Sequence, residues 1–348
     1  MTKAGAARKL ASAAVYGGGG VSMLGAGIYG VLRAEAAWAR ARIGNADRVT
    51  PDSTGWYGHH QSGPALRIAV LGDSTSVGYG VDRAEHTTGA RLAAGVAEGG
   101  RRKVHLRSYG MVGAKSSDLG DQVARALIVP PDAAVILVGA NDVTHRVRPS
   151  ESVRHLVEAV TRLREAGVEV IVGTCPDLGT VQPIAPPLKQ LAQSWSRRIA
   201  AAQTIGVVEA GGRTVSLAEV LGDRFLTDPK TFFGADRFHP SAVGYQALAG
   251  SLVPSTLVAL GLAPETEPVS ARGEAVMPIA SAAIQAVDTA GTELGGTSVG
   301  GSRSGVRGLW VTLRHRIRQT GVADEAPNES EDPRTVESEP PAPDPALK

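Results

Sequence analysis

From Leu66 to Leu260, short apolar runs alternate with longer segments that have the period of a helix. Such alternation is typical of βαβ units, in which helices cover both faces of a parallel sheet. The expected strands are Leu66–Leu71, Val104–Ser108, Ala133–Val138, Glu169–Val172 and Val207–Glu209. The expected helices are Thr88–Ala97, Ser116–Leu127, Ser150–Ala166, Pro187–Thr204 and Pro240–Leu260. The pattern predicts an α/β fold with a parallel sheet, whose functional side chains lie at the carboxyl ends of the strands.

Composition predicts one folded domain at 65–262 between two extensions. Residues 49–64 are rich in Gly, Ser, His and Pro, which indicates a linker. Residues 263–348 turn to Gly, Ser, Ala, Glu and Pro without a sustained period, which predicts a mostly disordered tail. Within this tail, apolar residues at helical spacing among five arginines predict a basic amphipathic helix near 306–318. Such a helix would bind an anionic membrane surface or dock its apolar stripe on the core.

Residues 1–48 contain an uncharged run of 23 residues, Leu10–Leu32, with basic residues on both sides. A membrane-spanning helix needs about 20 apolar residues, and a cleavable signal has an apolar region of only about 7–15. We therefore expect a membrane anchor. Because seven of the 23 residues are Gly and Ala34-Glu35-Ala36 resembles a cleavage site, a cleaved signal and a secreted protein are the alternative. We expect the folded domain on the extracytoplasmic side in either case.

The charge balance excludes some partners and sites. The chain has 36 Lys+Arg and 34 Asp+Glu, and the basic surplus lies in 1–48 and 303–318, which leaves 49–302 slightly acidic. A nucleic-acid-binding domain needs positive charge on its folded surface, so we expect no nucleic-acid partner. The single cysteine, Cys175, excludes an intramolecular disulfide and a zinc site built on paired cysteines.

A serine, a histidine and an aspartate stand at positions where they could act together. Ser74 follows the first strand in a tight Gly72-Asp73-Ser74 turn, where it would also serve as an ordinary helix cap. Asp236 and His239 are three residues apart in front of the last helix, so one turn can present both. A carboxylate beside an imidazole fixes its tautomer and lets it act as a general base toward a serine.

Neutral hydrogen-bond donors follow the next two strands. Gly110 and Gly113 come after the second strand, and Asn141 comes after the third. Backbone N–H groups at glycines, the Asn141 amide and the Ser74 N–H could together hold an oxyanion. Gly113 fits the spacing to the following helix better than Gly110. Each motif alone reads equally well as an ordinary turn or cap, but all fall in order at the ends of predicted strands.

With these motifs in order, the sequence from Leu66 to Leu260 resembles the SGNH or GDSL-type serine esterases and lipases. The matching residues are Gly72-Asp73-Ser74, Gly113, Gly139-x-Asn141-Asp142 and Asp236-x-x-His239-Pro240. The resemblance implies a flavodoxin-like three-layer fold and the hydrolysis of esters or thioesters without a metal or other cofactor. It implies that Ser74 is the nucleophile, His239 the base and Asp236 the residue that orients it. It also implies an oxyanion hole made by Ser74, Gly113 and Asn141.

Several alternatives stay open at this point. An O-acyltransferase would use the same serine, a metal-dependent phosphoesterase would use the Asp, Asn and His side chains as ligands, and a membrane scaffold would keep only the fold. The substrate is a small-molecule, lipid or glycan ester, and the oligomeric state is undetermined. Four aromatic residues would line an acyl pocket or belong to the core: Trp195, Phe232, Phe233 and Phe238. Asp73 and Asp142 are expected to bond the backbone and shape their turns.

Overall fold

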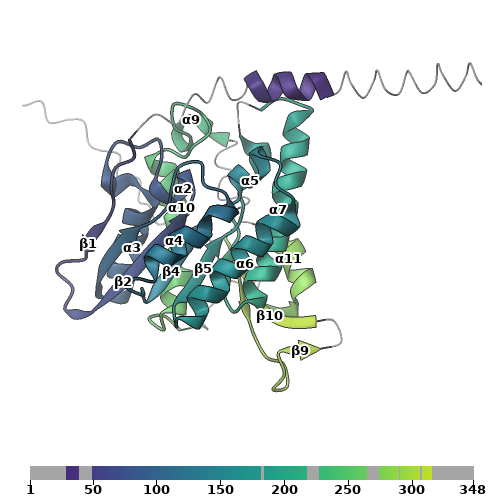
Figure 1. The fold of residues 1–348 in the computed structure, drawn as a ribbon. Helices are drawn as coiled ribbons and strands as arrows, with labels where there is room; N and C mark the ends of the chain where they lie inside the picture. Colours follow the sequence, from purple (N-terminus) through teal and green to yellow (C-terminus); the bar gives the residue numbers. More distant parts are fainter. Residues whose placement is uncertain are drawn as a thin grey trace, which may run out of the picture. The chain divides into compact units, whose positions relative to one another are not determined.

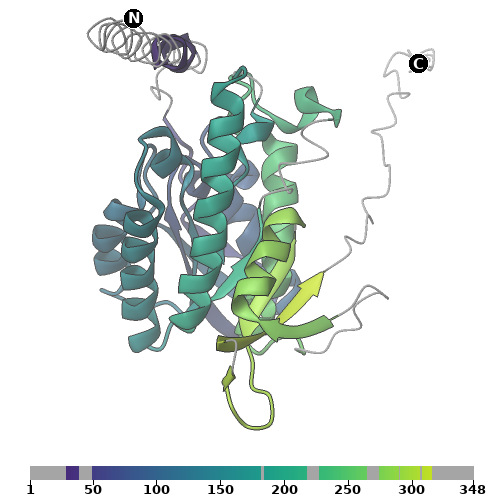
Figure 2. The same ribbon diagram turned by 90° about the vertical axis from the view of Figure 1, so that its right-hand side faces the viewer.

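The computed structural model describes residues 29–38, 49–181, 184–217, 227–264, 274–289, 291–305 and 308–315. Within these ranges one mixed sheet runs in the order β1-β3-β2-β4-β5-β6-β8-β10-β7, and β9 pairs with β10. Helices lie on both faces of the sheet (Figures 1 and 2). The arrangement has three layers, and it confirms the α/β fold expected from the sequence.

The centre of the sheet is parallel. It consists of β3 (Arg102–Ser108), β2 (Gly63–Gly72), β4 (Ala133–Leu137), β5 (Glu169–Gly173) and β6 (Arg213–Val215). Strand β4 is buried at every residue, which agrees with its continuous apolar run. The carboxyl ends of β2 and β4 therefore meet at one edge, with Gly72 in register with Leu137.

Each face of this centre has its own core. On one face, Ile68 and Val70 of β2 pack with residues of α3 (Thr88–Gly100) and α10 (Ala242–Ala259). On the other face, Ala69 and Leu71 pack with residues of α4 (Leu119–Ala126), α6 (Pro149–Glu165) and α7 (Leu188–Glu209). Because successive side chains of a strand point to opposite faces, one apolar strand supplies both cores.

The fifth predicted strand, Val207–Glu209, is wrong. These residues are the last turn of α7, which runs through Leu188–Glu209, and the strand at this position is β6 (Arg213–Val215). Val207 is buried on the helix in the core with α6. The turn at Gly211, whose φ is +84°, ends the helix, and the Gly212 N–H donates to the Val207 carbonyl.

The sheet continues past both ends of its parallel centre. Strand β1 (Gly55–Tyr57) pairs antiparallel with β3, so the predicted linker at 49–64 contains a strand and the first residues of β2. On the far side, β8 (Thr292–Gly296) pairs antiparallel with β6, and β10 (Gly308–His315) lies between β8 and β7 (Glu274–Pro278). Helix α11 (Ile279–Asp288) packs against α7, and β9 spans Ser304–Gly305. The domain therefore does not end at 262.

The predicted amphipathic helix near 306–318 is wrong in the described part, 308–315, which is strand β10. Val311 and Leu313 are buried on the same face because strand side chains alternate with a period of two. The helical spacing of Trp310 and Leu313 was coincidental, and the pairing with β7 and β8 comes from residues far along the chain. The prediction of a mostly disordered tail is likewise wrong for the strands and helix between 274 and 315.

Most of the predicted anchor, Leu10–Leu32, lies outside the described residues. A described helix covers 29–38, and the backbone N–H of Leu188 donates to Glu35 Oε2 at 3.1 Å. Among the described helices, α10 alone is long and apolar enough to cross a membrane by length and composition. Its packing against α3 in the core accounts for that apolar character equally well.

Candidate active site

Ser74 stands at the carboxyl edge of β2, as the first residue of the short helix α2 (Ser74–Val77). Asp73, and not Ser74, caps this helix, because Asp73 Oδ1 accepts a hydrogen bond from the Thr75 N–H at 2.9 Å. The preceding Gly72 has a φ of +126°, and a Cβ there would come within 1.8 Å of the Leu137 carbonyl oxygen. Glycine is therefore required for the turn that presents Ser74 beyond the strand.

The structure brings Ser74, His239 and Asp236 together. His239 Nε2 lies 3.0 Å from Ser74 Oγ, and His239 Nδ1 lies 2.7 Å from Asp236 Oδ2. Ser74 and His239 are buried, with 7% and 8% of their surface exposed. One hydrogen-bonded chain thus joins a hydroxyl from the first parallel strand to a carboxylate 162 residues further along the sequence.

The loop before α10 holds the imidazole in place. The backbone N–H groups of Phe238 and His239 both donate to Asp236 Oδ1 at 3.0 Å, which leaves Oδ2 for the ring. The Gly234 N–H donates to the His239 carbonyl at 2.8 Å and closes the loop. Helix α10 begins at Ala242 after a Ser241 cap, so the expected start at Pro240 is two residues early.

Two aromatic rings contact His239. Tyr79 lies 4.6 Å from the imidazole between ring centroids, and Phe238 meets it edge-on at 4.9 Å. The buried Tyr245 of α10 supports this packing, because its hydroxyl donates to the Tyr79 carbonyl at 2.7 Å. Sequence reasoning missed Tyr79 and Tyr245, since neither belongs to a local motif and they lie 166 residues apart.

Burial and hydrogen bonding give the two carboxylates near His239 opposite pKa shifts. Burial raises the pKa of Asp236. The hydrogen bond to His239, the charge of His239 and the hydrogen bonds from two backbone N–H groups lower it more, so the pKa lies below its ordinary value. Burial dominates at Asp73 and raises its pKa to about 6, although Thr75 and the charge of His239 lower it. Asp236 is therefore an anion at neutral pH beside the ring that would gain a proton.

The loops that carry the candidate oxyanion donors are tied to each other. Asn141, in the first turn of α5 (Ala140–Thr144), donates through Nδ2 to the Ala114 carbonyl at 3.0 Å. The buried Asp142 accepts from the Ser116 N–H at 3.1 Å and from Ser116 Oγ at 3.0 Å. Asp142 therefore bonds the backbone of the loop after β3, whereas Asp73 bonds Thr75 within its own turn. The loop after β3 is fixed to the loop after β4.

The two candidate glycines have different surroundings. A Cβ at Gly110 would come within 1.9 Å of Ser76 Oγ in α2, so Gly110 is needed for close packing under the Ser74 helix. Gly113 has a φ of +82°, and a Cβ there would meet no atom within 4 Å. Gly113 therefore has open space on the side where a Cβ would stand. The Met111 N–H donates to the Gly72 carbonyl and joins this loop to the end of β2.

The four aromatic candidates for an acyl pocket divide into two groups. Phe233 is buried, and Phe232 packs against it. Trp195 and Phe238 pack instead with Leu178 and Val181, and the Trp195 indole N–H donates to the Val147 carbonyl. Phe238 meets the His239 ring edge-on. Within the part of the chain that the structure describes, no three His, Cys, Asp or Glu side chains gather as metal ligands would.

Comparison with known proteins gives concordant results. Residues 70–247 match the sequence model of the GDSL-like lipase/acylhydrolase family. The chain is 39% identical over 256 residues to the GDSL-like esterase Rv1075c of Mycobacterium tuberculosis, which covers 70% of this chain and 80% of that protein.

Solved structures of similar fold include LAE5, an alpha/beta hydrolase enzyme from the metagenome of Lake Arreo. It is 22% identical, with a TM-score of 0.44 over 57% of this chain and 95% of its own. A mutant of Axe2, an acetyl-xylooligosaccharide esterase from Geobacillus stearothermophilus, is 16% identical, with a TM-score of 0.45 over 58% and 97%.

Proposed function

Because the chain belongs to the GDSL-like lipase/acylhydrolase family and is thus a carboxylic ester hydrolase, we propose that it works through an acyl-enzyme on Ser74. The observation that carries the proposal is the hydrogen-bonded chain from Ser74 Oγ through His239 to Asp236, with distances of 3.0 and 2.7 Å. This is the geometry in which a serine hydroxyl becomes a nucleophile.

The reaction proceeds in two halves. Ser74 Oγ attacks the acyl carbonyl carbon while His239 Nε2 takes the hydroxyl proton. The tetrahedral intermediate then collapses, and the leaving alkoxide takes that proton from His239, which leaves an ester on Ser74. Water attacks this ester with His239 again as base, and the acid departs as Ser74 Oγ recovers its proton. Thioesters would follow the same steps with a thiolate as leaving group.

Asp236 makes this proton transfer favourable. It fixes the tautomer of His239 by accepting from Nδ1, so that Nε2 is free to receive the proton from Ser74. Its lowered pKa keeps it ionised, and its negative charge stabilises the imidazolium that forms. The two backbone N–H groups that hold Oδ1 keep the carboxylate from rotating away.

The oxyanion would be held by the Ser74 N–H, the Gly113 N–H and the Asn141 amide. One proton of Asn141 Nδ2 is used on the Ala114 carbonyl, and the second remains for the substrate. The open space beside Gly113 and the ties between the two loops support this assignment. Each such donor contributes about 3 kcal/mol to the stabilisation of the transition state.

The test is fluorophosphonate labelling followed by hydrolysis of esters of increasing acyl chain length. Wild-type protein should be labelled once, and Ser74→Ala should lose both label and activity. Ser76→Ala is the matched control, because Ser76 lies in the same helix with its hydroxyl bonded to the Asp73 carbonyl. Labelling of Ser74→Ala, or activity that survives in it and disappears with EDTA, would contradict the mechanism and favour a metal-dependent phosphoesterase.

We further propose that Leu10–Leu32 anchors the enzyme in a membrane, with the domain on the extracytoplasmic side. The proposal rests on the uncharged run of 23 residues and its basic flanks. A topology reporter has to be fused at the C-terminus, because a fusion after residue 262 would remove strands of the sheet. Membrane fractionation and reporter activity outside the cytoplasm are expected, and a soluble or cytoplasmic protein would refute the anchor or its orientation.

A further inference from the structure

One face of the sheet carries a basic surface away from the catalytic edge. Strand β3 alternates buried Val104 and Leu106 with His105 and Arg107, which point to the opposite face. The chain crosses from β3 to β4 by way of α4, which packs on β2, and on this face of β3 His105 is half-buried and Arg107 is exposed. The face of β3 beside α4 is therefore left partly open, and its residues are basic where a covered strand would be apolar.

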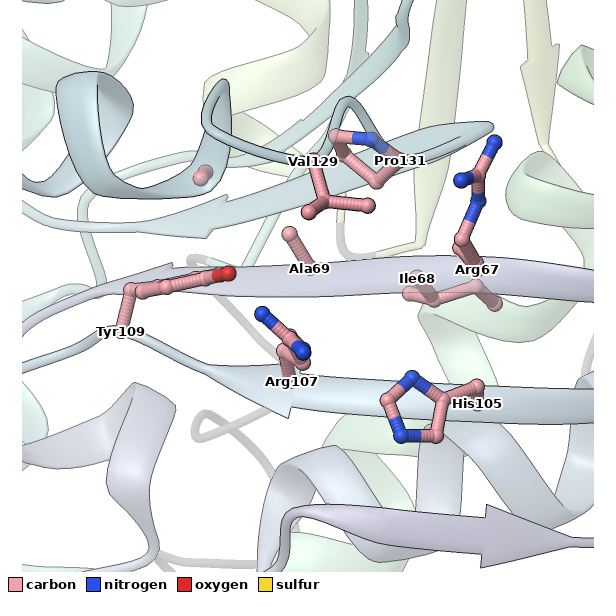
Figure 3. A pocket seen from close by; sticks show the side chains of 9 residues that line it. Arg67, Ile68, Ala69, His105, Arg107, Tyr109, Val129 and Pro131 are labelled. Atoms are coloured by element: carbon pink, nitrogen blue, oxygen red, sulfur yellow. The ribbon is translucent and has the colours of Figure 1, made fainter.

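This open face contains a cavity of about 50 Å³ (Figure 3). Its floor is formed by β2 and β3, and Val129 and Pro131 close it from the α4–β4 connection. The side chains of Arg67, His105 and Arg107 line it together with Tyr109. The Trp56 ring of β1 lies 4.8 Å from that of His105 and extends the wall.

The positive charge in this cavity has no compensating carboxylate. No hydrogen bond or ion pair joins the guanidinium of Arg67 or Arg107 to an acidic side chain within the described ranges. Asp132 is the neighbouring acid, and its Oδ2 accepts from the Arg67 backbone N–H at 2.7 Å. Both guanidinium groups thus keep their full set of donors for a ligand.

We propose that this cavity binds the phosphate group of a phosphate ester. Guanidinium groups match the oxygens of phosphate with pairs of parallel hydrogen bonds, and Arg67 from β2 and Arg107 from β3 offer two such groups at different sides of the cavity, with His105 beside them (Figure 3). A water needs about 10–15 Å³ of such space, so a cavity of about 50 Å³ holds a small oxyanion in place of about three to five waters. The same group could come from a soluble phosphate ester or from a phospholipid headgroup.

The exposed residues beside the cavity are relevant to the second source, a phospholipid headgroup. Ile128 and Val129 lie in the α4–β4 connection and are 78% and 41% exposed, and Trp56 is 49% exposed. Apolar and aromatic side chains around a basic pocket are suited to the interface of an anionic membrane. The site is independent of the acyl-enzyme mechanism, because none of its residues contacts Ser74, His239 or Asp236 in the described hydrogen-bond network.

The experiment titrates the full-length chain with inorganic phosphate, followed by calorimetry and by the ³¹P resonance. Wild type should bind saturably, and the double variant Arg67→Gln/Arg107→Gln should bind at least about tenfold more weakly, which is 1.4 kcal/mol. Arg162→Gln/Arg198→Gln is the matched control, since both are exposed arginines, on α6 and α7, and the pair removes the same two charges elsewhere. Equal binding by wild type and Arg67→Gln/Arg107→Gln, equal loss in the control pair, or no saturable binding would overturn the proposal.

Vesicle flotation separates the two sources. Vesicles of phosphatidylcholine, with and without phosphatidic acid, are mixed with the same variants, all of which keep the N-terminal run. If wild type floats more strongly than Arg67→Gln/Arg107→Gln, and does so only when phosphatidic acid is present, the ligand is a phospholipid headgroup. Phosphate binding without such a difference identifies a soluble ester. Ester hydrolysis should remain unchanged in the double variant, so failure of this site and failure of the Ser74 mechanism are distinguishable.

Discussion

The loop before α10 and the turn after β2 each place a carboxylate near His239, but only the loop holds its carboxylate as a stable anion. Asp236 accepts three hydrogen bonds, from the His239 ring and from two backbone N–H groups. Asp73 is more deeply buried and accepts one, from Thr75. Burial therefore raises the pKa of Asp73 to about 6, whereas hydrogen bonds lower that of Asp236. Asp236 can serve the base because its Oδ2 meets His239 Nδ1 at 2.7 Å and its hydrogen bonds keep it ionised, whereas Asp73 bonds Thr75 within its own turn.

Among the substitutions of these carboxylates, Asp236→Asn should cause the largest loss of activity. An amide in place of the carboxylate would donate to His239 Nδ1 and place the ring proton on Nε2, which then cannot accept from Ser74. We expect kcat to fall about 10⁴-fold with little change in KM. Steady-state kinetics on a chromogenic ester, with the melting temperature as a check on folding, measures this. A loss of less than tenfold would remove Asp236 from the mechanism.

Asp142 is a second buried carboxylate, and its variants separate the effect of its hydrogen bonds from the effect of its charge. Burial raises its pKa, as at Asp73, yet it accepts from the Ser116 N–H and Oγ, as Asp236 accepts from its loop. Asp142→Ala should destabilise the fold by about 2–3 kcal/mol, because it leaves buried donors unpaired. It should also lower kcat about tenfold, because the loop with Gly113 loses its tie to the loop with Asn141.

Asp142→Asn is the matched variant, since the amide keeps an oxygen for Ser116. It should retain most of the stability and activity that Asp142→Ala loses, as thermal unfolding and kinetics would reveal. If both substitutions were equally harmful, the negative charge of Asp142 and not its hydrogen bonds would hold the loops.

Asp73→Asn tests the raised pKa of Asp73 through the pH dependence of stability. A carboxyl whose folded pKa of about 6 exceeds its ordinary value of 3.8 binds protons more tightly in the folded state. Its contribution to stability is therefore present below pH 3.8 and is lost as the pH rises through 6, by about 3 kcal/mol in all. Asp73→Asn removes this term, so its stability relative to wild type should increase from pH 4 to pH 8 in urea titrations. Activity should stay within about tenfold, and a constant difference across pH would contradict the raised pKa.

Four of the five strands of the parallel centre, and the spacing of the candidate site residues, could be predicted because they have local patterns. Strand β4 is five apolar residues in a row, and the spacing of Asp236 and His239 fits one turn. Strand β6 is three residues long and includes Arg213, so the apolar Val207 nearby was mistaken for its start. Strand β10 is buried only because β7 and β8 flank it, and no pattern within 308–315 reveals those partners.

The support around the site was equally beyond sequence reasoning. Gln122 of α4 accepts from the Gly72 N–H and donates to the Gly72 carbonyl, across 50 residues, and so holds the end of β2. Nothing around Gln122 in the sequence distinguishes it from a surface glutamine of a helix. Residues that perform chemistry occur in fixed motifs, whereas residues that hold those motifs are selected by contacts that only the folded chain creates.

Tyr245→Phe should have the smallest effect and tests how far the support of His239 extends. The substitution removes the buried hydrogen bond to the Tyr79 carbonyl, and we expect about 1 kcal/mol lower stability and about a threefold lower kcat, because Tyr79 packs on the imidazole. Tyr57→Phe is the matched control, since Tyr57 donates to the Ser53 carbonyl at the same 2.7 Å on β1, outside the catalytic contacts. Thermal unfolding should show a smaller loss in Tyr57→Phe, whose hydrogen bond is only partly buried, and kinetics should show a loss only in Tyr245→Phe. If kcat is unchanged in both, the two backbone hydrogen bonds to Asp236 are enough to position His239. The packing of Tyr79 on the imidazole then contributes nothing to catalysis.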